Sequence, residues 1–181
     1  MNSPAQNKLR VTVAELVIFA MFGALMYATT YVMKVLPNVH LLGLFIVTLT
    51  AVYRFKALIP LYIYIFLEGL FMGFSPWWWP SLHVWAVLWG AAMLLPRNMP
   101  AWLAAAVYPL VSGLHGLCFG LLFAPAQMLL FYGGDFSFFW PWVAAGFPFD
   151  VTHAIGNVAS GLLILPLVRL LTKLQARYMR R

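Results

Sequence analysis

Charged residues are scarce in this 181-residue chain, and acidic ones most of all. Only four residues are Asp or Glu, and charged residues make up 8% of the sequence against 64% hydrophobic ones. A soluble domain carries roughly 25% charged residues, so a soluble globular fold is excluded. Long apolar runs such as ELVIFAMFGALMYATTYVM do not alternate, which favours membrane helices over the short alternating strands of a β-barrel.

Cysteine and catalytic motifs are equally sparse. The single cysteine, Cys118, lies in an apolar run, so one chain cannot build a disulfide or a thiolate cluster. The sequence has no H-E-x-x-H motif and no glycine-rich phosphate loop with its lysine. Ser112 precedes His115 by three residues, but no oxyanion-hole motif accompanies them. We therefore predict no metal, no cofactor and no enzymatic activity.

Six membrane-spanning helices are predicted from the apolar runs, because about 20 such residues cross a bilayer. Charge, proline and glycine separate the runs. The fifth run is long enough to tilt or break near Pro125. The predicted spans lie, within one domain covering residues 1–181, at about 12–33, 39–53, 57–75, 81–95, 101–131 and 141–170.

Lysine and arginine are distributed very unequally between the two sides of the predicted spans. One side carries only Lys34. The other side carries Lys8, Arg10, Arg54, Lys56, Arg97, Arg169, Lys173, Arg177, Arg180 and Arg181. Cytoplasmic loops retain positive charge, so we expect both termini in the cytoplasm of a cell in whose plasma membrane the chain lies. The net charge of +7 is then a topology signal and gives no support to nucleic-acid binding.

The last span carries three polar residues on one helix face. Asp150, His153 and Asn157 follow an i, i+3, i+7 spacing. Polar groups inside spans are costly and usually face the bundle interior, so we predict that this face looks inward and contacts a ligand. Pro148 suits the first turn of the same helix. A structural hydrogen-bond chain is the alternative role.

Two glutamates lie in other spans. Glu68 lies about 18 Å along its helix from Lys56, in the outer half of the span. We predict that it contacts or organises the ligand, with a protonated carboxyl or a helix-to-helix hydrogen bond as the alternative. Glu15, near the depth of Arg10 and Arg54, is expected in an interfacial ion pair.

Aromatic residues concentrate in the predicted outer loops, in FMGFSPWWWPSLHVWAV (71–87) and FYGGDFSFFWPW (131–142). Tryptophan at a membrane interface commonly forms a belt, which remains open for Trp77 and Trp78. The total aromatic surface exceeds what anchoring requires, and such surfaces stack planar ligands. The predicted ligand contacts are Glu68, Trp79, His83, Trp85, Trp140, Asp150, His153 and Asn157.

Small residues form a stripe on the first span, at Ala20, Ala24 and Ala28 with Gly23, where another helix can approach closely. Packing within the bundle is the alternative. Together with six short spans, cytoplasmic termini and an outward aromatic cavity, this stripe resembles the S components of energy-coupling factor (ECF) transporters. The stretches YIFLEGLFMGFSPWWWPSLHVW and AAGFPFDVTHAIGNVASGLLI look like those of one subgroup of these subunits.

The resemblance implies a membrane-embedded subunit that captures a water-soluble vitamin or its precursor from outside. It implies docking of Ala20, Ala24 and Ala28 onto a transmembrane coupling subunit that sits on two ATP-binding-cassette (ABC) ATPases. ATP use by these partners would topple the loaded subunit in the bilayer. Family ligand contacts correspond here to Trp79, His83, Trp85, Trp140, Asp150, His153 and Asn157.

The scarcity of basic residues on the outer face argues against a strongly anionic ligand such as folate. We expect a neutral or weakly charged heteroaromatic compound, for example a pyrimidine, a pyridoxine-like or a queuine-like molecule, with cobalamin as an alternative. A stand-alone permease or membrane enzyme using Glu68, Asp150 and His153 for proton handling is the alternative function. A purely structural membrane subunit is a third.

Overall fold

The chain folds almost wholly into helix. The computed structural model describes residues 11–36 and 38–178, and no strand occurs among them, so the all-α prediction is confirmed. Lys8, Arg10, Arg180 and Arg181 of the predicted charge asymmetry lie outside the described residues. Short 3-10 turns are η2 (Met33–Val35), η3 (Arg54–Ala57) and η4 (Phe136–Phe138). The α-helices are α1 (Val13–Val32), α2 (Leu42–Tyr53), α3 (Leu58–Met72), α4 (Ser81–Leu94), α5 (Ala101–Leu117), α6 (Phe119–Phe131), α7 (Phe139–Gly161) and α8 (Ile164–Tyr178).

Several of these helices suit a bilayer by length and composition. The segments Val13–Val35, Leu42–Met72 and Ala101–Phe131 are each long and apolar enough to cross a membrane. A fourth is added if Phe136–Gly161 and Ile164–Arg177, which meet at 46°, act as one broken span. The apolar helix α4 is shorter, with 14 residues. The fold is thus compatible with membrane insertion, while the six spans and the orientation of the termini stay predictions.

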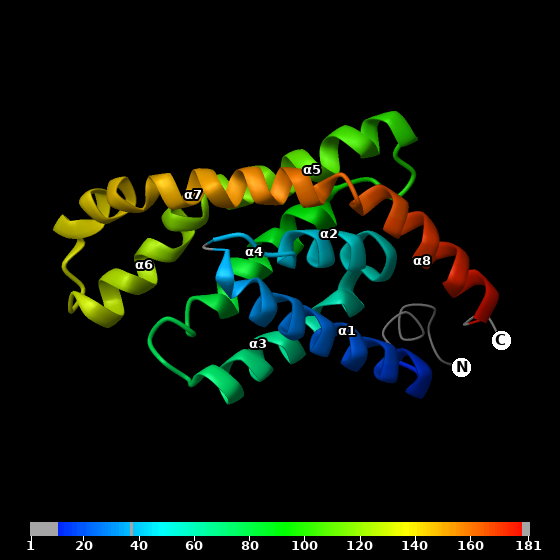
Figure 1. Ribbon diagram of the computed structural model, residues 1–181, viewed down its shortest axis with the longest axis horizontal. Helices are drawn as coiled ribbons and strands as arrows, with labels where there is room; N and C mark the ends of the chain where they lie inside the picture. Colours follow the sequence, from blue (N-terminus) through cyan, green and yellow to red (C-terminus); the bar gives the residue numbers. More distant parts are fainter. Residues whose placement is uncertain (1–10, 37, 179–181) are drawn as a thin grey trace, which may run out of the picture.

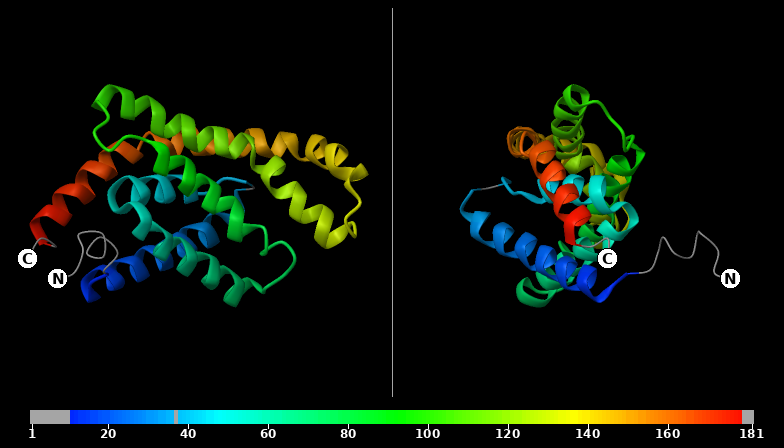
Figure 2. Two further views of the ribbon diagram at one scale, coloured as in Figure 1. Left: turned by 180° about the vertical axis from the view of Figure 1, so that it is seen from behind. Right: turned by 90° about the vertical axis from the view of Figure 1, so that its right-hand side faces the viewer.

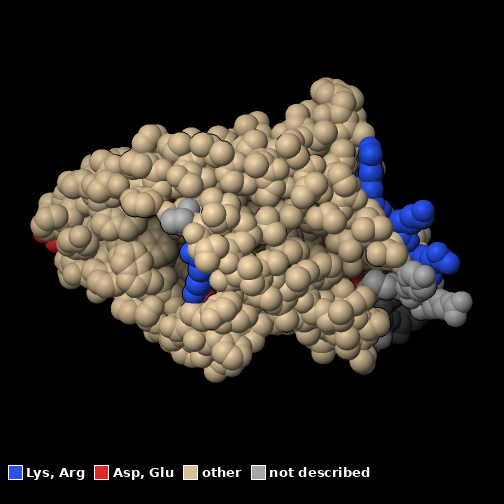
Figure 3. All heavy atoms as spheres, viewed as in Figure 1, with Lys and Arg blue, Asp and Glu red and all other residues tan. Residues whose placement is uncertain are grey.

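Successive helices alternate in direction along the long axis. Figures 1 and 2 show α1, α3 and the pair α5–α6 running toward one end, and α2, α4 and the pair α7–α8 running back. Within Leu42–Met72 the reversal falls at Arg54, whose φ of 56° and ψ of −122° end α2. We call the end where α1 begins and α8 ends the basic end, because Lys and Arg gather there (Figure 3). The opposite end, with the α3–α4 and α6–α7 connections, is the aromatic end.

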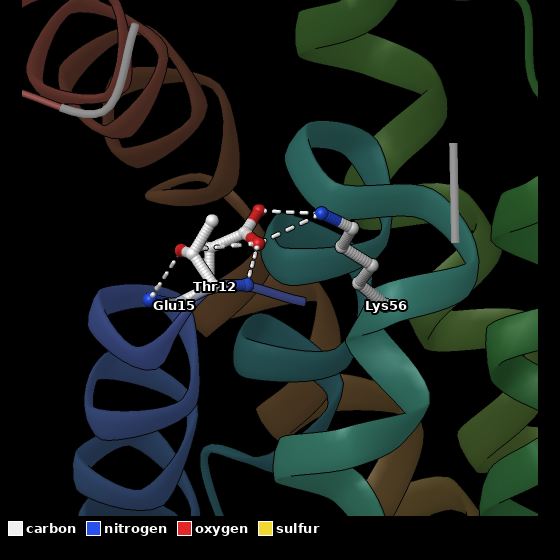
Figure 4. A network of polar contacts seen from close by, with 3 residues as sticks. All are labelled: Thr12, Glu15 and Lys56. Carbon is white, nitrogen blue, oxygen red and sulfur yellow. Dashed lines mark hydrogen bonds and ion pairs between the residues drawn. The ribbon is translucent and has the colours of Figure 1, made fainter. Parts of the chain in front are cut away.

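Glu15 joins α1 to the α2–α3 turn at the basic end. Lys56 Nζ lies 2.6 Å from its Oε1 and 2.8 Å from its Oε2 (Figure 4). Glu15 also closes a capping box at the start of α1: Thr12 N–H donates to Glu15 Oε2 at 2.9 Å, and Glu15 N–H donates to Thr12 Oγ1 at 3.2 Å. The predicted ion pair of Glu15 is therefore confirmed, with Lys56 as its partner.

Two predicted spans are each divided into two helices. The fifth divides at Cys118, where φ is −93° and ψ is 5°, and the sixth divides between α7 and α8. The expected break near Pro125 is wrong, because α6 continues through it. The N–H of Gly120, two residues beyond Cys118, donates a hydrogen bond to the Asp150 side chain on α7. This tertiary contact stabilises the break between α5 and α6. Pro148 lies inside α7 and not in its first turn, which corrects that prediction.

Glycine lets α5 and α7 pack closely. A Cβ atom at Gly116 would lie 2.9 Å from Ala154 N and 2.9 Å from Asn157 Nδ2. Gly113 of α5 and Gly161 of α7 face the partner helix at similarly short range. Membrane helices associate through such small residues, because close backbone approach supplies the packing that lipid does not drive. The contact presses the polar face of α7 against α5.

We expect Gly116→Ala to lower the stability of the protein by about 1–3 kcal/mol, because the added methyl pushes α5 away from α7. Gly90→Ala in α4 is the matched control, since no atom lies within 4 Å of its added Cβ and alanine favours helix by roughly 1 kcal/mol. Thermal unfolding of both variants in detergent checks this. Equal midpoints for the two variants would contradict the close contact.

Candidate ligand-binding site

A cavity opens at the aromatic end, between α6, α7 and the α3–α4 connection. Its volume is about 610 Å³, within the range of small-molecule sites. Mostly apolar walls with a few convergent polar groups are typical of such sites. The aromatic walls come from Trp77, Phe119, Phe123 and Trp142, and the polar floor from Asp150 and His153.

Three rings form a continuous aromatic wall, and two of them stack on Phe123. The Trp77 ring centroid lies 5.8 Å from that of Phe123 with 27° between the planes. The Trp142 ring lies 6.1 Å from Phe123 with only 6° between the planes. Stacked pairs contribute about 0.5–1.5 kcal/mol beyond their buried area. The wall therefore ties the α3–α4 connection to α6 and α7 and gives the cavity an aromatic lining.

Asp150 is the acidic group of the cavity and is only 4% exposed. Its Oδ1 and Oδ2 accept from the backbone N–H of Gly120 at 3.0 Å and 3.1 Å. Gly120 lies in the first turn of α6, so the carboxylate satisfies an amide that a helix start leaves unpaired, at the end that favours negative charge. A Cβ at Gly120 would lie 2.5 Å from Asp150 Oδ2. The contact therefore depends on glycine at this position.

Three histidines gather behind the floor of the cavity. The His40 ring lies 4.9 Å from His153 and 5.2 Å from Trp85, and the Trp85 ring lies 5.5 Å from His115. His115 Nε2 lies 2.9 Å from the carbonyl oxygen of Val84; because a carbonyl only accepts, Nε2 carries the proton. Both ring nitrogens of His40 and Nδ1 of His115 and His153 are buried without a partner. Among the described residues, no three His, Cys, Asp or Glu side chains are arranged to hold a metal ion.

Four of the predicted ligand contacts lie in or behind the cavity. Asp150 and His153 line it. Trp85 is buried among the histidines, and Asn157 Nδ2 donates to the Ser112 carbonyl oxygen on α5 at 3.1 Å. The prediction that Asp150, His153 and Asn157 share an inward face is confirmed, because all three are buried. Asn157 thus clamps α7 to α5 and supports the floor from behind.

Three other predicted contacts at this end do not line the cavity. Trp79 and Trp140 are 51% and 69% exposed. Trp140 precedes the wall residue Trp142 by two positions, which places it on another side of α7. His83 of α4 instead bridges to α6, with Nε2 3.0 Å from the Leu122 carbonyl oxygen.

Glu68 also lies apart from the cavity, on α3. Tyr64 of the same helix and the positive charge of Lys34 lie close enough to interact with its carboxyl. Lys34 itself also contacts Met72 Sδ at 2.8 Å. Glu68 therefore does not line the cavity, and its predicted ligand role stays a prediction.

The predicted docking stripe faces outward. Ala20, Ala24 and Ala28 are exposed on α1, whereas Gly23 is buried. A Cβ at Gly23 would lie 2.8 Å from Ile63 Cβ on α3, so only this small residue serves packing within the bundle. Ala24 and Ala28 line an apolar groove of about 530 Å³ on the outer surface of α1.

Sequence reasoning missed most of the cavity wall. The predicted ligand contacts do not include Trp77, for which a membrane belt is an open alternative, nor Phe119 and Phe123. A signal was present on α7, because Trp142, Phe149 and His153 are spaced by seven and four residues, as one helix face requires. Beginning that helix at residue 139 would have separated Trp142 from Trp140.

We expect Asp150→Ala to lower stability by about 1–3 kcal/mol, because it leaves the buried Gly120 N–H without an acceptor. Asp150→Asn is the matched control, since its Oδ1 can still accept that bond. Thermal unfolding of the two variants in detergent gives the comparison. If Asp150→Ala unfolds at the same temperature as Asp150→Asn, the carboxylate does not hold the start of α6.

Comparison with models of known protein families, with curated proteins and with solved structures finds no match for this chain. The basis for a function is therefore the cavity at the aromatic end, the exposed stripe on α1 and the sequence resemblance given above. Each of these lies on residues that the structure describes.

Proposed function

We propose that this chain is the substrate-capture subunit of an ECF-type importer in a prokaryotic plasma membrane. It would bind a water-soluble vitamin or vitamin precursor at the aromatic end and release it at the basic end. The observation that carries the proposal is the cavity of about 610 Å³ with stacked aromatic walls and the Asp150 and His153 floor. Such a site suits capture of a small planar molecule.

The position of the cavity supports the direction of transport. Lys and Arg gather at the end opposite to it (Figure 3). Positive charge remains on the cytoplasmic side, so in the proposed six-span arrangement the basic end faces the cytoplasm and the cavity faces outward. A volume of about 610 Å³ favours a ligand of one or two rings over cobalamin.

The α1 stripe supports a partner in the membrane. Exposed Ala20, Ala24 and Ala28 leave a smooth surface on which a helix of the coupling subunit can pack closely. The sequence has no phosphate-binding loop of its own, so ATP hydrolysis would fall to two ABC ATPases below that subunit. Toppling of the loaded body would then expose the cavity to the cytoplasm.

Binding is tested with the purified protein in detergent. We expect denaturation to release a small molecule that mass spectrometry identifies, and we expect that molecule to quench tryptophan fluorescence on titration. Trp142→Phe should weaken its binding about fivefold, because ring area in the wall is lost. Trp102→Phe is the control, since Trp102 is 75% exposed on α5 and lies outside the cavity. No released molecule and no quenching with a broad vitamin panel would defeat the proposal.

Docking is tested with a bulky residue on α1. We expect Ala24→Trp to abolish uptake in cells that carry the whole transporter, while ligand binding by the purified subunit stays within about twofold of the original. The control is Ala105→Trp, because Ala105 is exposed on α5 and far in sequence from the stripe. Normal uptake by Ala24→Trp would instead favour a stand-alone permease that needs no coupling subunit.

A further inference from the structure

The residues that line the cavity include an acidic side chain but no basic one. Asp150 is the only acidic residue among those that line it, and no Lys or Arg of the described residues lines it. Lys56 forms its ion pair with Glu15 at the basic end, the end opposite to this site. Among the described residues, the hydrogen-bond partner of Asp150 is the Gly120 N–H, although Asp150 is almost fully buried. A buried carboxylate of this kind gains stability from a positive charge brought beside it.

The aromatic walls of the cavity also favour a positively charged ligand. The faces of aromatic rings carry negative charge density, so the Trp77 and Trp142 rings, which line the cavity and cover Phe123, attract a cation placed against them. His153, which lines the cavity and is 6% exposed, has its Nδ1 buried without a partner. An imidazole nitrogen without a bond leaves hydrogen-bonding capacity in the floor next to the carboxylate. Aromatic faces around a carboxylate therefore form a site for a positively charged ring.

The aromatic end carries a second negative charge, outside the residues that line the cavity. Asp135 lies in the exposed turn before η4, at the aromatic end. Hydrogen bonds from the Ser137 side chain and from its backbone N–H lower the pKa of Asp135. Since most Lys and Arg lie at the opposite end (Figure 3), the field along the molecule draws cations toward the cavity and repels them from the basic end.

We infer that the ligand of this cavity is an organic cation with a planar aromatic ring, its charge beside Asp150 and its ring against the Trp77, Phe123 and Trp142 wall. This inference rests on the proposed capture function and narrows the expected neutral or weakly charged compounds to positively charged ones. Anionic vitamins are excluded, because the floor would oppose them and no basic residue that lines the cavity would compensate.

Three probes with the same fused rings test the inference by calorimetric titration of the purified protein at neutral pH: N-methylquinolinium, quinoline and quinoline carboxylate. The first is a permanent cation, the second is neutral and the third is an anion. We expect the cation to bind about tenfold or more tightly than quinoline, because its charge interacts with a buried carboxylate. The anion should bind most weakly.

Asp150→Asn separates charge from shape, because it keeps the size of the side chain and the acceptor for Gly120. We expect it to weaken the cation about tenfold or more and to leave quinoline within about twofold. Asp135→Asn is the control, since an exposed charge is screened by salt, and each probe should stay within about twofold. Unfolding midpoints confirm that both variants are folded.

Equal binding of N-methylquinolinium and quinoline overturns the inference, as does an Asp150→Asn variant that weakens both alike. Failure of all three probes to bind overturns it too. The capture function is judged separately, by the molecule released from the purified protein. Release of a neutral compound would support the capture function and contradict the inference that the ligand is a cation.

Discussion

The close approach of α5 and α7 is the constraint on which the rest of the molecule depends. Gly113 and Gly116 of α5 and Gly161 of α7 add no side chain of their own to the contact, so polar groups on one helix reach the backbone of the other. Asn157 uses that proximity to bond the carbonyl of Ser112. Without glycine on α5, the polar face of α7 would lie too far away to find partners, and burying it in an apolar bundle would be costly.

The same face determines where α5 ends. One and two turns before Asn157 along α7, His153 and Asp150 lie on that face, and the Asp150 carboxylate takes the N–H of Gly120. In an α-helix that continued through Cys118, the Gly120 N–H would donate to a backbone carbonyl of the same helix. The Asp150 carboxylate offers this N–H another acceptor. α6 then begins as a new helix and diverges from α7, as Figures 1 and 2 show. The cavity lies in this divergence, with Asp150 at its apex.

Local periodicity could be read from the sequence, whereas contacts between distant segments could not. The inward face of Asp150, His153 and Asn157 follows from helix spacing, and the ion pair of Glu15 follows from charge at one depth. The break at Cys118 depends on a bond between residues 30 positions apart, Gly120 and Asp150, so proline seemed the better signal. His40 joined the cluster only through the path of the segment before α2. The predicted contact Trp140 lies two residues before the wall residue Trp142 and on another side of α7, a difference that depends on where the helix begins.

The three acidic side chains within the helices are stabilised in this apolar protein by different partners. Glu15 pairs with Lys56 at the basic end. Glu68 has the Tyr64 side chain and the positive charge of Lys34 close by. Asp150 has a backbone amide and the start of α6, with no Lys or Arg of the described residues in an ion pair with it. It is also the one acid of the three that lines the aromatic cavity.

Burying a carboxylate without a partner of opposite charge costs several kcal/mol. At Asp150 the hydrogen bond from Gly120 offsets only part of this cost, and the carboxylate lines a cavity that a ligand can enter. In the proposed site, a positive group that enters the cavity would offset the rest of this cost, so the charge of Asp150 would contribute to the affinity for a cationic ligand.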